Sequence, residues 1–167
     1  LNNLKGKKVA DLCAAPGGKS FQLISMGAKV TAYEKNFKRA KLLKNNFQRL
    51  NFKSNIIVKD ILKVNNSEKF DIVILDAPCS SIGTIRRNPE IFFRSKSPDF
   101  IKITNLQKNL LNIAKKLLKT NGLLIYMVCS FFYEEGEIII EKFLKKNKNF
   151  EIKKFSIKKL KNINSYI

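Results

Sequence analysis

The chain has 167 residues, 44% of them hydrophobic, and its 33 Lys and Arg against 13 Asp and Glu give a formal net charge of +20. This length fits one globular domain, and the apolar runs are too short to span a bilayer. The N-terminus does not resemble a signal peptide, so we expect a cytoplasmic protein. Three Cys and no His provide neither a disulfide framework nor a zinc site, so we expect reduced thiols and no metal.

The predicted secondary structure alternates short apolar runs with amphipathic segments. We predict strands at residues 9–12, 28–33, 56–58, 70–75 and 123–128, with a weak strand at 150–155. We predict helices beginning at Phe21 and spanning residues 37–50, 100–118 and 134–146, with Gly122 as the C-terminal signal of the third. Residues 153–161 are Lys-rich and weakly patterned, typical of a solvated tail. This alternation predicts an α/β fold with a mostly parallel, doubly wound sheet.

The excess of positive charge is typical of a protein that binds a polyanion such as RNA. A second interpretation stays open, because the chain is rich in Lys, Asn, Ile and Phe, which an AT-rich genome favours. Part of the charge could therefore reflect codon bias on solvated faces. We expect a monomer that binds RNA and no membrane.

A long loop at residues 80–98 is the segment where we expect substrate contacts, because loops of this length in compact domains usually serve function. Arg86, Arg87 and Arg94 offer phosphate contacts, and Phe92 and Phe93 offer stacking faces. The alternative is that at least one of the two Phe packs the loop onto the core.

Two cysteines each follow a predicted strand, Cys79 after 70–75 and Cys129 after 123–128. In an open α/β sheet, ligands bind outside the carboxyl ends of the strands. We therefore expect both thiols to face one shared site, which favours thiolate chemistry.

A glycine-rich turn, residues 13–20, follows the first strand and allows a ligand to approach the backbone closely. Glu34 ends the second strand, where an acid suits ribose hydroxyls, and Asp60 follows the third, where it suits an adenine amino group. A phosphate-binding P-loop is the rival interpretation, with Cys13 in place of its first Gly and Asp76 ending a magnesium-binding strand.

Three blocks of the sequence carry a family resemblance: residues 11–20 (DLCAAPGGKS), residues 76–89 (DAPCSSIGTIRRNP), and Val128-Cys129-Ser130 followed by Glu134, Glu135 and Glu137. Together they resemble the Sun family of RNA cytosine carbon-5 methyltransferases. The resemblance implies a Rossmann-like methyltransferase fold, S-adenosylmethionine as cofactor, and ribosomal small-subunit RNA as substrate. Ser81, Val128 and Glu34 depart from the usual pattern, and an N-terminal RNA-binding region and a final strand are expected to be missing from this domain.

The resemblance also implies roles for single residues. Glu34 would contact the cofactor ribose, Asp60 its adenine, and Asp76 the rim between cofactor and base. Cys129 would be the nucleophile, and Cys79 the second thiol, acting in adduct breakdown. The methionine end of the cofactor would be surrounded by Cys13, Ala14, Ala15, Pro16, Gly17, Gly18 and Lys19. We assign Cys13 itself mainly to packing and backbone shape.

The chemistry explains why such residues are needed. Carbon 5 of cytosine is a poor nucleophile, and a thiolate added at carbon 6 activates it. A carboxylic acid such as Asp76 could favour the addition by protonating nitrogen 3. We expect nearby Lys and Arg, or a helix N-terminus after Cys129, to lower the pKa of that thiol. A noncatalytic RNA-binding scaffold of the same fold is a further alternative.

Overall fold

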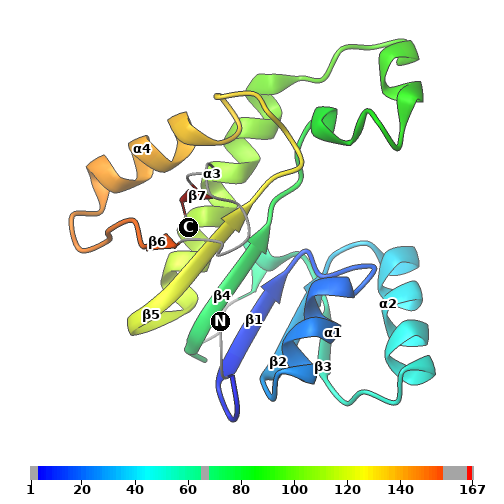
Figure 1. Ribbon diagram of the computed structural model, residues 1–167, viewed down its shortest axis with the longest axis vertical. Coiled ribbons are helices and arrows are strands. Elements are labelled where there is room, and N and C mark those ends of the chain that lie inside the picture. The colour runs from blue at the N-terminus through cyan, green and yellow to red at the C-terminus, as the bar shows by residue number, and fades with distance from the viewer. Residues whose placement is uncertain (1–3, 65–67, 156–164, 167) are drawn as a thin grey trace.

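A computed structural model of the protein describes residues 4–64, 68–155 and 165–166, and its centre is a five-stranded parallel sheet (Figure 1). The strand order is β3-β2-β1-β4-β5. The strands are β1 (Lys8–Leu12), β2 (Lys29–Glu34), β3 (Asn55–Val58), β4 (Phe70–Asp76) and β5 (Leu118–Met127). The helices are α1 (Gly18–Ser25), α2 (Phe37–Arg49), α3 (Phe100–Leu117) and α4 (Glu137–Lys146). These elements confirm the predicted α/β fold.

Shorter elements connect this framework. Three 3-10 helices are η1 (Ile61–Lys63), η2 (Ile82–Thr84) and η3 (Pro89–Phe93). β6 (Lys154–Phe155) and β7 (Ser165–Tyr166) form a separate antiparallel pair. The predicted strand at 150–155 is thus reduced to its last two residues, and residues 156–161 of the predicted tail lie outside the described part of the chain.

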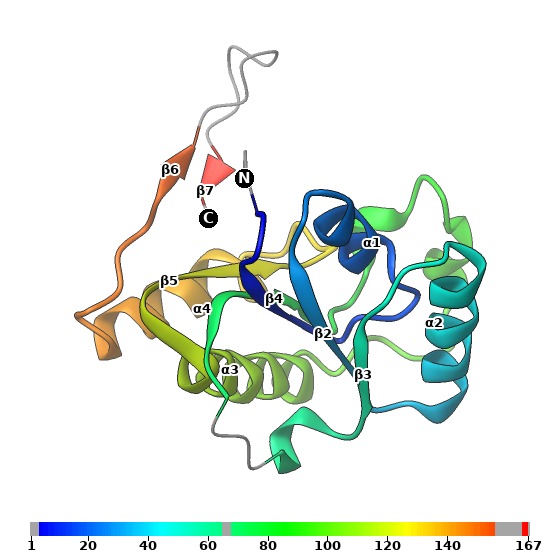
Figure 2. The same ribbon diagram turned by 90° about the horizontal axis from the view of Figure 1, so that it is seen from below.

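Helices cover both faces of the sheet, α1 and α2 on one side and α3 and α4 on the other (Figure 2). Alternate strand residues point to opposite faces, which divides the core into two layers. Val9 and Ile72 pack with Leu23 of α1, whereas Leu12 and Val73 pack in the cluster that includes α3 and α4. This burial on both faces explains the nearly continuous apolar runs of the strands.

The strand order reverses direction between β1 and β4. The chain first builds outward from β1 through β2 to β3, and then crosses back to place β4 on the other side of β1. In open parallel sheets this reversal creates a crevice at the carboxyl ends of the two central strands. The topology therefore directs a ligand to the residues that follow Leu12 and Asp76.

The junction between α3 and β5 differs from the prediction. The helix ends at Leu117, and Leu118 already pairs with Phe70 of β4. Gly122 lies in an irregularity of β5, since the next paired residue is Leu123, opposite Ile72. The assignment of Gly122 to the helix end was therefore wrong, because ladder pairing with β4 takes over directly after the helix.

Two helix starts also move relative to the prediction. α1 begins at Gly18 instead of Phe21, and α4 begins at Glu137 instead of Glu134, after turns whose hydrogen bonds include Glu135 N to Phe132 O at 3.1 Å. Within the described residues, no helix is both long and apolar enough to cross a membrane.

Candidate functional site

The turn after β1 is held in place by its neighbours. Ala14 N donates to the Tyr33 carbonyl of β2 at 2.9 Å, and Cys13 adopts a φ of 68° as the chain leaves the strand. Two side chains of α2 hold the turn from the side: Arg39 donates to the Ala15 carbonyl at 2.5 Å, and Asn46 to the Pro16 carbonyl at 3.0 Å. The backbone of the turn is therefore fixed by its neighbours before any ligand binds, at the carboxyl ends of β1 and β4.

The two glycines of this turn have different surroundings. Gly17 has a φ of 115°, and a Cβ there would overlap the Phe21 ring and lie 2.8 Å from Leu43 Cδ1. A Cβ on Gly18 would meet nothing within 4 Å. Gly17 is required by packing and backbone conformation, whereas Gly18 faces space that a ligand could use.

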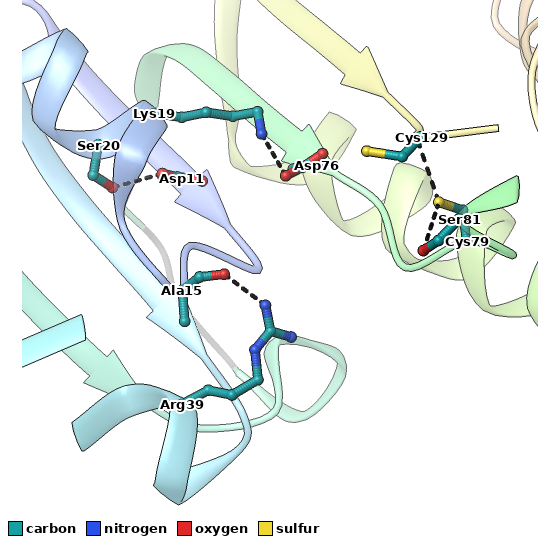
Figure 3. Close-up of polar contacts among 9 residues, drawn as sticks. All are labelled: Asp11, Ala15, Lys19, Ser20, Arg39, Asp76, Cys79, Ser81 and Cys129. Carbon is teal, nitrogen blue, oxygen red and sulfur yellow. Dashed lines mark hydrogen bonds and ion pairs between the residues drawn. The ribbon is translucent and has the colours of Figure 1, made fainter. Parts of the chain in front are cut away.

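A buried carboxyl group lies beneath the turn. Asp11 of β1 is 1% exposed, and Ser20 Oγ of α1 donates to its Oδ2 at 2.5 Å (Figure 3). Burial raises the pKa of Asp11 to about 6, although the hydrogen bond from Ser20 and the charge of Lys19 act in the opposite direction. This pair ties the start of α1 to the end of β1.

The two predicted cofactor acids line one pocket, together with Cys13, Tyr33 and Pro78. Glu34 is 3% exposed; its Oε1 accepts from Asn36 N at 2.9 Å. Its Oε2 lies 3.7 Å from Arg39 Nε and accepts no hydrogen bond from the part of the chain that the structure describes. Asp60 caps η1, accepting from Leu62 N at 3.0 Å. The structure thus brings Glu34 and Asp60 together, as expected.

An ion pair spans the crevice where the strand order reverses. Lys19, in the first turn of α1, places its Nζ 2.6 Å from Oδ2 of Asp76 at the end of β4 (Figure 3). Both side chains are partly exposed. Asp76 therefore lies between the glycine-rich turn and the cysteines.

The structure brings the two predicted thiols together. Cys129 N donates to Cys79 Sγ at 3.3 Å, and Gly83 N donates to the Cys129 carbonyl at 3.0 Å. Figure 3 shows Cys79 and Cys129 near each other, beyond the ends of β4 and β5 and on the far side of Asp76 from the turn. The two strands are adjacent and parallel, so their carboxyl ends deliver both thiols to one edge.

The charges around Cys129 do not lower its pKa. Partial burial of the thiol raises the pKa, although the residue as a whole is exposed, and Cys79 and Asp76 raise it further. Lys19 and Arg87 act in the opposite direction without outweighing these effects. The expectation of a lowered pKa was wrong, because partial burial of the sulfur, together with Cys79 and Asp76, outweighs the neighbouring Lys19 and Arg87.

The third thiol, Cys13, is more strongly perturbed. Burial, followed by the charges of Glu34 and Asp11, raises its pKa to about 12. A thiol with so high a pKa is a poor nucleophile at neutral pH.

One of the three arginines in the loop at residues 80–98 is hydrogen-bonded to the backbone of that loop. Arg94 donates to the Ser80 carbonyl at 3.0 Å, and Arg86, Arg87 and Arg94 are all exposed. Phe92 and Phe93 are 72% and 85% exposed, so the alternative that they pack the loop onto the core was wrong. Ile91, which is 9% exposed, takes that role.

Known proteins resemble this chain along almost its whole length. The sequence model described as 16S rRNA methyltransferase RsmB/F matches residues 1–166. This chain belongs to the 16S rRNA methyltransferase RsmB/F family. Membership confirms the resemblance to the Sun family and the Rossmann-like methyltransferase fold.

Three relatives illustrate the similarity of this RsmB/F-family domain. Ribosomal RNA small subunit methyltransferase B of Shewanella oneidensis is 37% identical over 141 residues, which are 81% of this chain and 33% of the relative. The Photorhabdus laumondii protein of the same name is 33% identical over 157 residues, 91% of this chain and 37% of the relative. The crystal structure of NSun6 from Pyrococcus horikoshii with SFG has a TM-score of 0.80 at 27% identity, covering 90% of this chain and 39% of that one. The chain thus spans about a third of the length of the curated relatives it matches.

The P-loop alternative finds no support in this RsmB/F-family domain. A P-loop lysine reaches the phosphates held by its own loop. Lys19 instead reaches across to the carboxylate of Asp76 at 2.6 Å. The family match over residues 1–166 supports the methyltransferase interpretation of this turn instead.

Sequence reasoning missed one buried network of this RsmB/F-family site. Glu135 is 0% exposed and accepts hydrogen bonds from Ser80 and Gln107. Glu135 stood in a recognised block, but its burial could not be seen there, since Glu134 beside it is exposed. Gln107 carried no signal except its place in the pattern of α3.

Proposed function

We propose that this domain transfers a methyl group from S-adenosylmethionine to carbon 5 of a cytosine in ribosomal small-subunit RNA. The observation that carries the proposal is that Cys79 and Cys129 lie together beside Asp76, with Cys129 N donating to Cys79 Sγ at 3.3 Å. Family membership and the names of the curated relatives support the RNA class. The net charge of +20 supports a polyanionic substrate, and this substrate leads us to propose a cytoplasmic location.

The crevice fits the proposed cofactor. Oε2 of Glu34 is a buried acceptor without a hydrogen-bond donor among the described residues, which suits a ribose hydroxyl group. Asp60 in the same pocket suits the adenine amino group, and the open space at Gly18 allows close approach to the turn. The NSun6 relative solved with SFG supports a ligand in this fold. When bound, S-adenosylmethionine would supply the methyl group as an electrophilic sulfonium.

The first step that we assign to the protein is nucleophilic addition. Cys129 loses its proton and forms a bond from Sγ to carbon 6 of the cytosine, while nitrogen 3 gains a proton. We assign Asp76, which lies between the turn and the thiols, to hold that proton. Carbon 5 then carries the electron density that accepts the methyl group. Because the pKa of Cys129 is raised, we expect substrate binding to activate the thiol.

The second step regenerates the enzyme. The proton on carbon 5 leaves to a base, the bond between Sγ and carbon 6 breaks, and Cys129 recovers as a thiolate while nitrogen 3 releases its proton. Cys79 is the group that we assign to this elimination, because its sulfur lies against the backbone of Cys129. Neither thiol needs a histidine, and the chain contains none.

A covalent trap tests the two roles. Cys79→Ala should accumulate a protein–RNA adduct with a small-subunit RNA fragment and S-adenosylmethionine, because addition proceeds and elimination is blocked. Cys129→Ala should form no adduct, and neither should the double variant, which serves as the control. The measurement is a denaturing gel with labelled RNA. An adduct in Cys129→Ala but not in Cys79→Ala would exchange the two roles, and none in either variant would refute the covalent mechanism.

A further inference from the structure

Glu135 is the most deeply buried acidic side chain near the thiols. It is 0% exposed, and both carboxylate oxygens accept hydrogen bonds. Oε1 accepts from Ser80 N at 2.7 Å and from Gln107 Nε2 at 3.3 Å, and Oε2 accepts from Ser80 Oγ at 2.5 Å. Burying a carboxylate is costly unless it is hydrogen-bonded. The buried position of Glu135 therefore depends on its hydrogen bonds with Ser80 and Gln107.

The partners of Glu135 surround Cys79 on both sides. Ser80 follows Cys79 directly, and its carbonyl accepts from Arg94 at 3.0 Å. Gln107 also donates to the carbonyl of Pro78, the residue before Cys79, at 2.9 Å. Side chains from α3 and from two loops therefore hold the peptide groups that flank the thiol. They do so where β4 has already ended and no ladder holds the chain.

The other end of this network reaches β5 and the loop after it, which carries Cys129. Tyr126 of β5 donates its hydroxyl to the Glu135 carbonyl at 2.7 Å. Ser80 Oγ lies 3.3 Å from Ser130 Oγ, and Ser130 follows Cys129 directly. One residue thus links the two thiol-bearing loops through its side chain and its backbone.

We propose that Glu135 is a positioning residue that fixes Cys79 against Cys129 and thereby sets the rate of adduct breakdown. The inference rests on the proposed function, since it concerns the elimination step. Glu135 acts through Ser80 on the Cys79 loop, not on the RNA or the cofactor. Its loss should therefore resemble the loss of Cys79 and leave addition by Cys129 in place.

The decisive comparison uses substitutions of the network and of an exposed neighbour. Glu135→Ala removes the acceptors of all three hydrogen bonds, and we expect about tenfold or more adduct relative to the unmodified chain. Ser80→Ala, which removes only the hydroxyl contacts, should shift the adduct in the same direction by less. Glu135→Gln should stay near the unmodified chain, because its amide can accept from Ser80 N and donate to Ser80 Oγ. Glu134→Ala is the matched control and should leave the adduct level unchanged.

A second measurement does not depend on RNA. Cys79 is partly buried, so release of its loop should raise its rate of alkylation by iodoacetamide about tenfold in Glu135→Ala, whereas the low reactivity of Cys13 should stay unchanged as long as the fold is intact. Peptide mass spectrometry measures each thiol separately, and circular dichroism checks that the variants fold. If Glu135→Ala does not fold, the alkylation of Cys79 in Ser80→Ala decides the question.

The outcomes separate this inference from the proposed function. Adduct in Cys79→Ala but none in Glu135→Ala, with unchanged alkylation of Cys79, would refute the positioning role alone. Faster alkylation of Cys79 in Glu135→Ala without an adduct in any variant would refute the covalent mechanism, and with it the role of Glu135 in elimination. The conclusion that Glu135 holds the Cys79 loop in place would be retained. Equal adduct levels in Glu135→Ala and Glu134→Ala would also refute the positioning role.

Discussion

Asp11 is a residue whose charge the fold disfavours. Its pKa rises from 3.8 to about 6, chiefly because it is buried. Between these values the folded protein keeps a proton that the unfolded chain has released, so stability falls as pH rises through this range. Well above about pH 6, Asp11 is ionised in both the folded and the unfolded protein, and the loss of stability is complete. The difference of about two pKa units corresponds to about 3 kcal/mol.

Replacing this carboxyl group should remove that pH dependence. We expect the free energy of unfolding of the unmodified chain to fall by up to about 3 kcal/mol relative to Asp11→Asn between pH 4 and pH 7. Urea denaturation at several pH values measures it. Asp71→Asn is a control that retains the Asp11 effect and should run parallel to the unmodified chain, because Lys119 and the backbone of Lys8 lower the pKa of Asp71 and its own pH dependence lies below this range. Parallel curves for Asp11→Asn and the unmodified chain would contradict the prediction.

At the scale of elements, the turn between β1 and α1 contains glycines, which are typical of a flexible segment, but its contacts with α2 hold it in one conformation. Its carbonyls are held by Arg39 and Asn46 of α2, and Gly17 has no room for a side chain. Gly18 lies in the same turn without such contacts. Substitutions of the two adjacent glycines can therefore distinguish a requirement of the fold, at Gly17, from a requirement of ligand binding, at Gly18.

Gly17→Ala should destabilise the protein by about 2–5 kcal/mol, because it combines backbone strain with overlap on Phe21. Gly18→Ala should change stability by no more than about 0.5 kcal/mol. It should nevertheless weaken S-adenosylmethionine binding about tenfold if the ligand approaches this turn. Urea denaturation and calorimetry are the two measurements. Unchanged binding by Gly18→Ala would place the ligand elsewhere.

The elements differ in how far they could be predicted. Strands such as residues 70–75 were predicted within one residue, because a buried parallel strand is a local apolar run. The start of β5 was missed by five residues, since Leu118 becomes strand only by pairing with Phe70. Lys119 then pairs with Asp71 at 2.8 Å, a contact that also depends on the neighbouring strand.

At the scale of the whole molecule, the net charge of +20 predicts a strong dependence of RNA binding on salt. Each phosphate contact releases counterions, so affinity for single-stranded RNA should fall about tenfold or more between 50 and 200 mM salt. Fluorescence anisotropy with a labelled oligonucleotide measures this. An affinity that does not change with salt would favour codon bias as the origin of the charge.

The sequence by itself determined the alternation of strands and helices, the three family blocks, and the delivery of Cys79 and Cys129 to one sheet edge. These features are encoded in short windows, where hydrophobic period and motif spacing are visible. Only the tertiary structure decided that Arg94 binds the Ser80 carbonyl, that the pKa of Cys129 is raised, and that Glu135 binds Ser80. The partners of Glu135 lie 28 and 55 residues away along the chain, so no local pattern specifies them. Packing of α3 and the β5–α4 loop around the end of β4 brings them together.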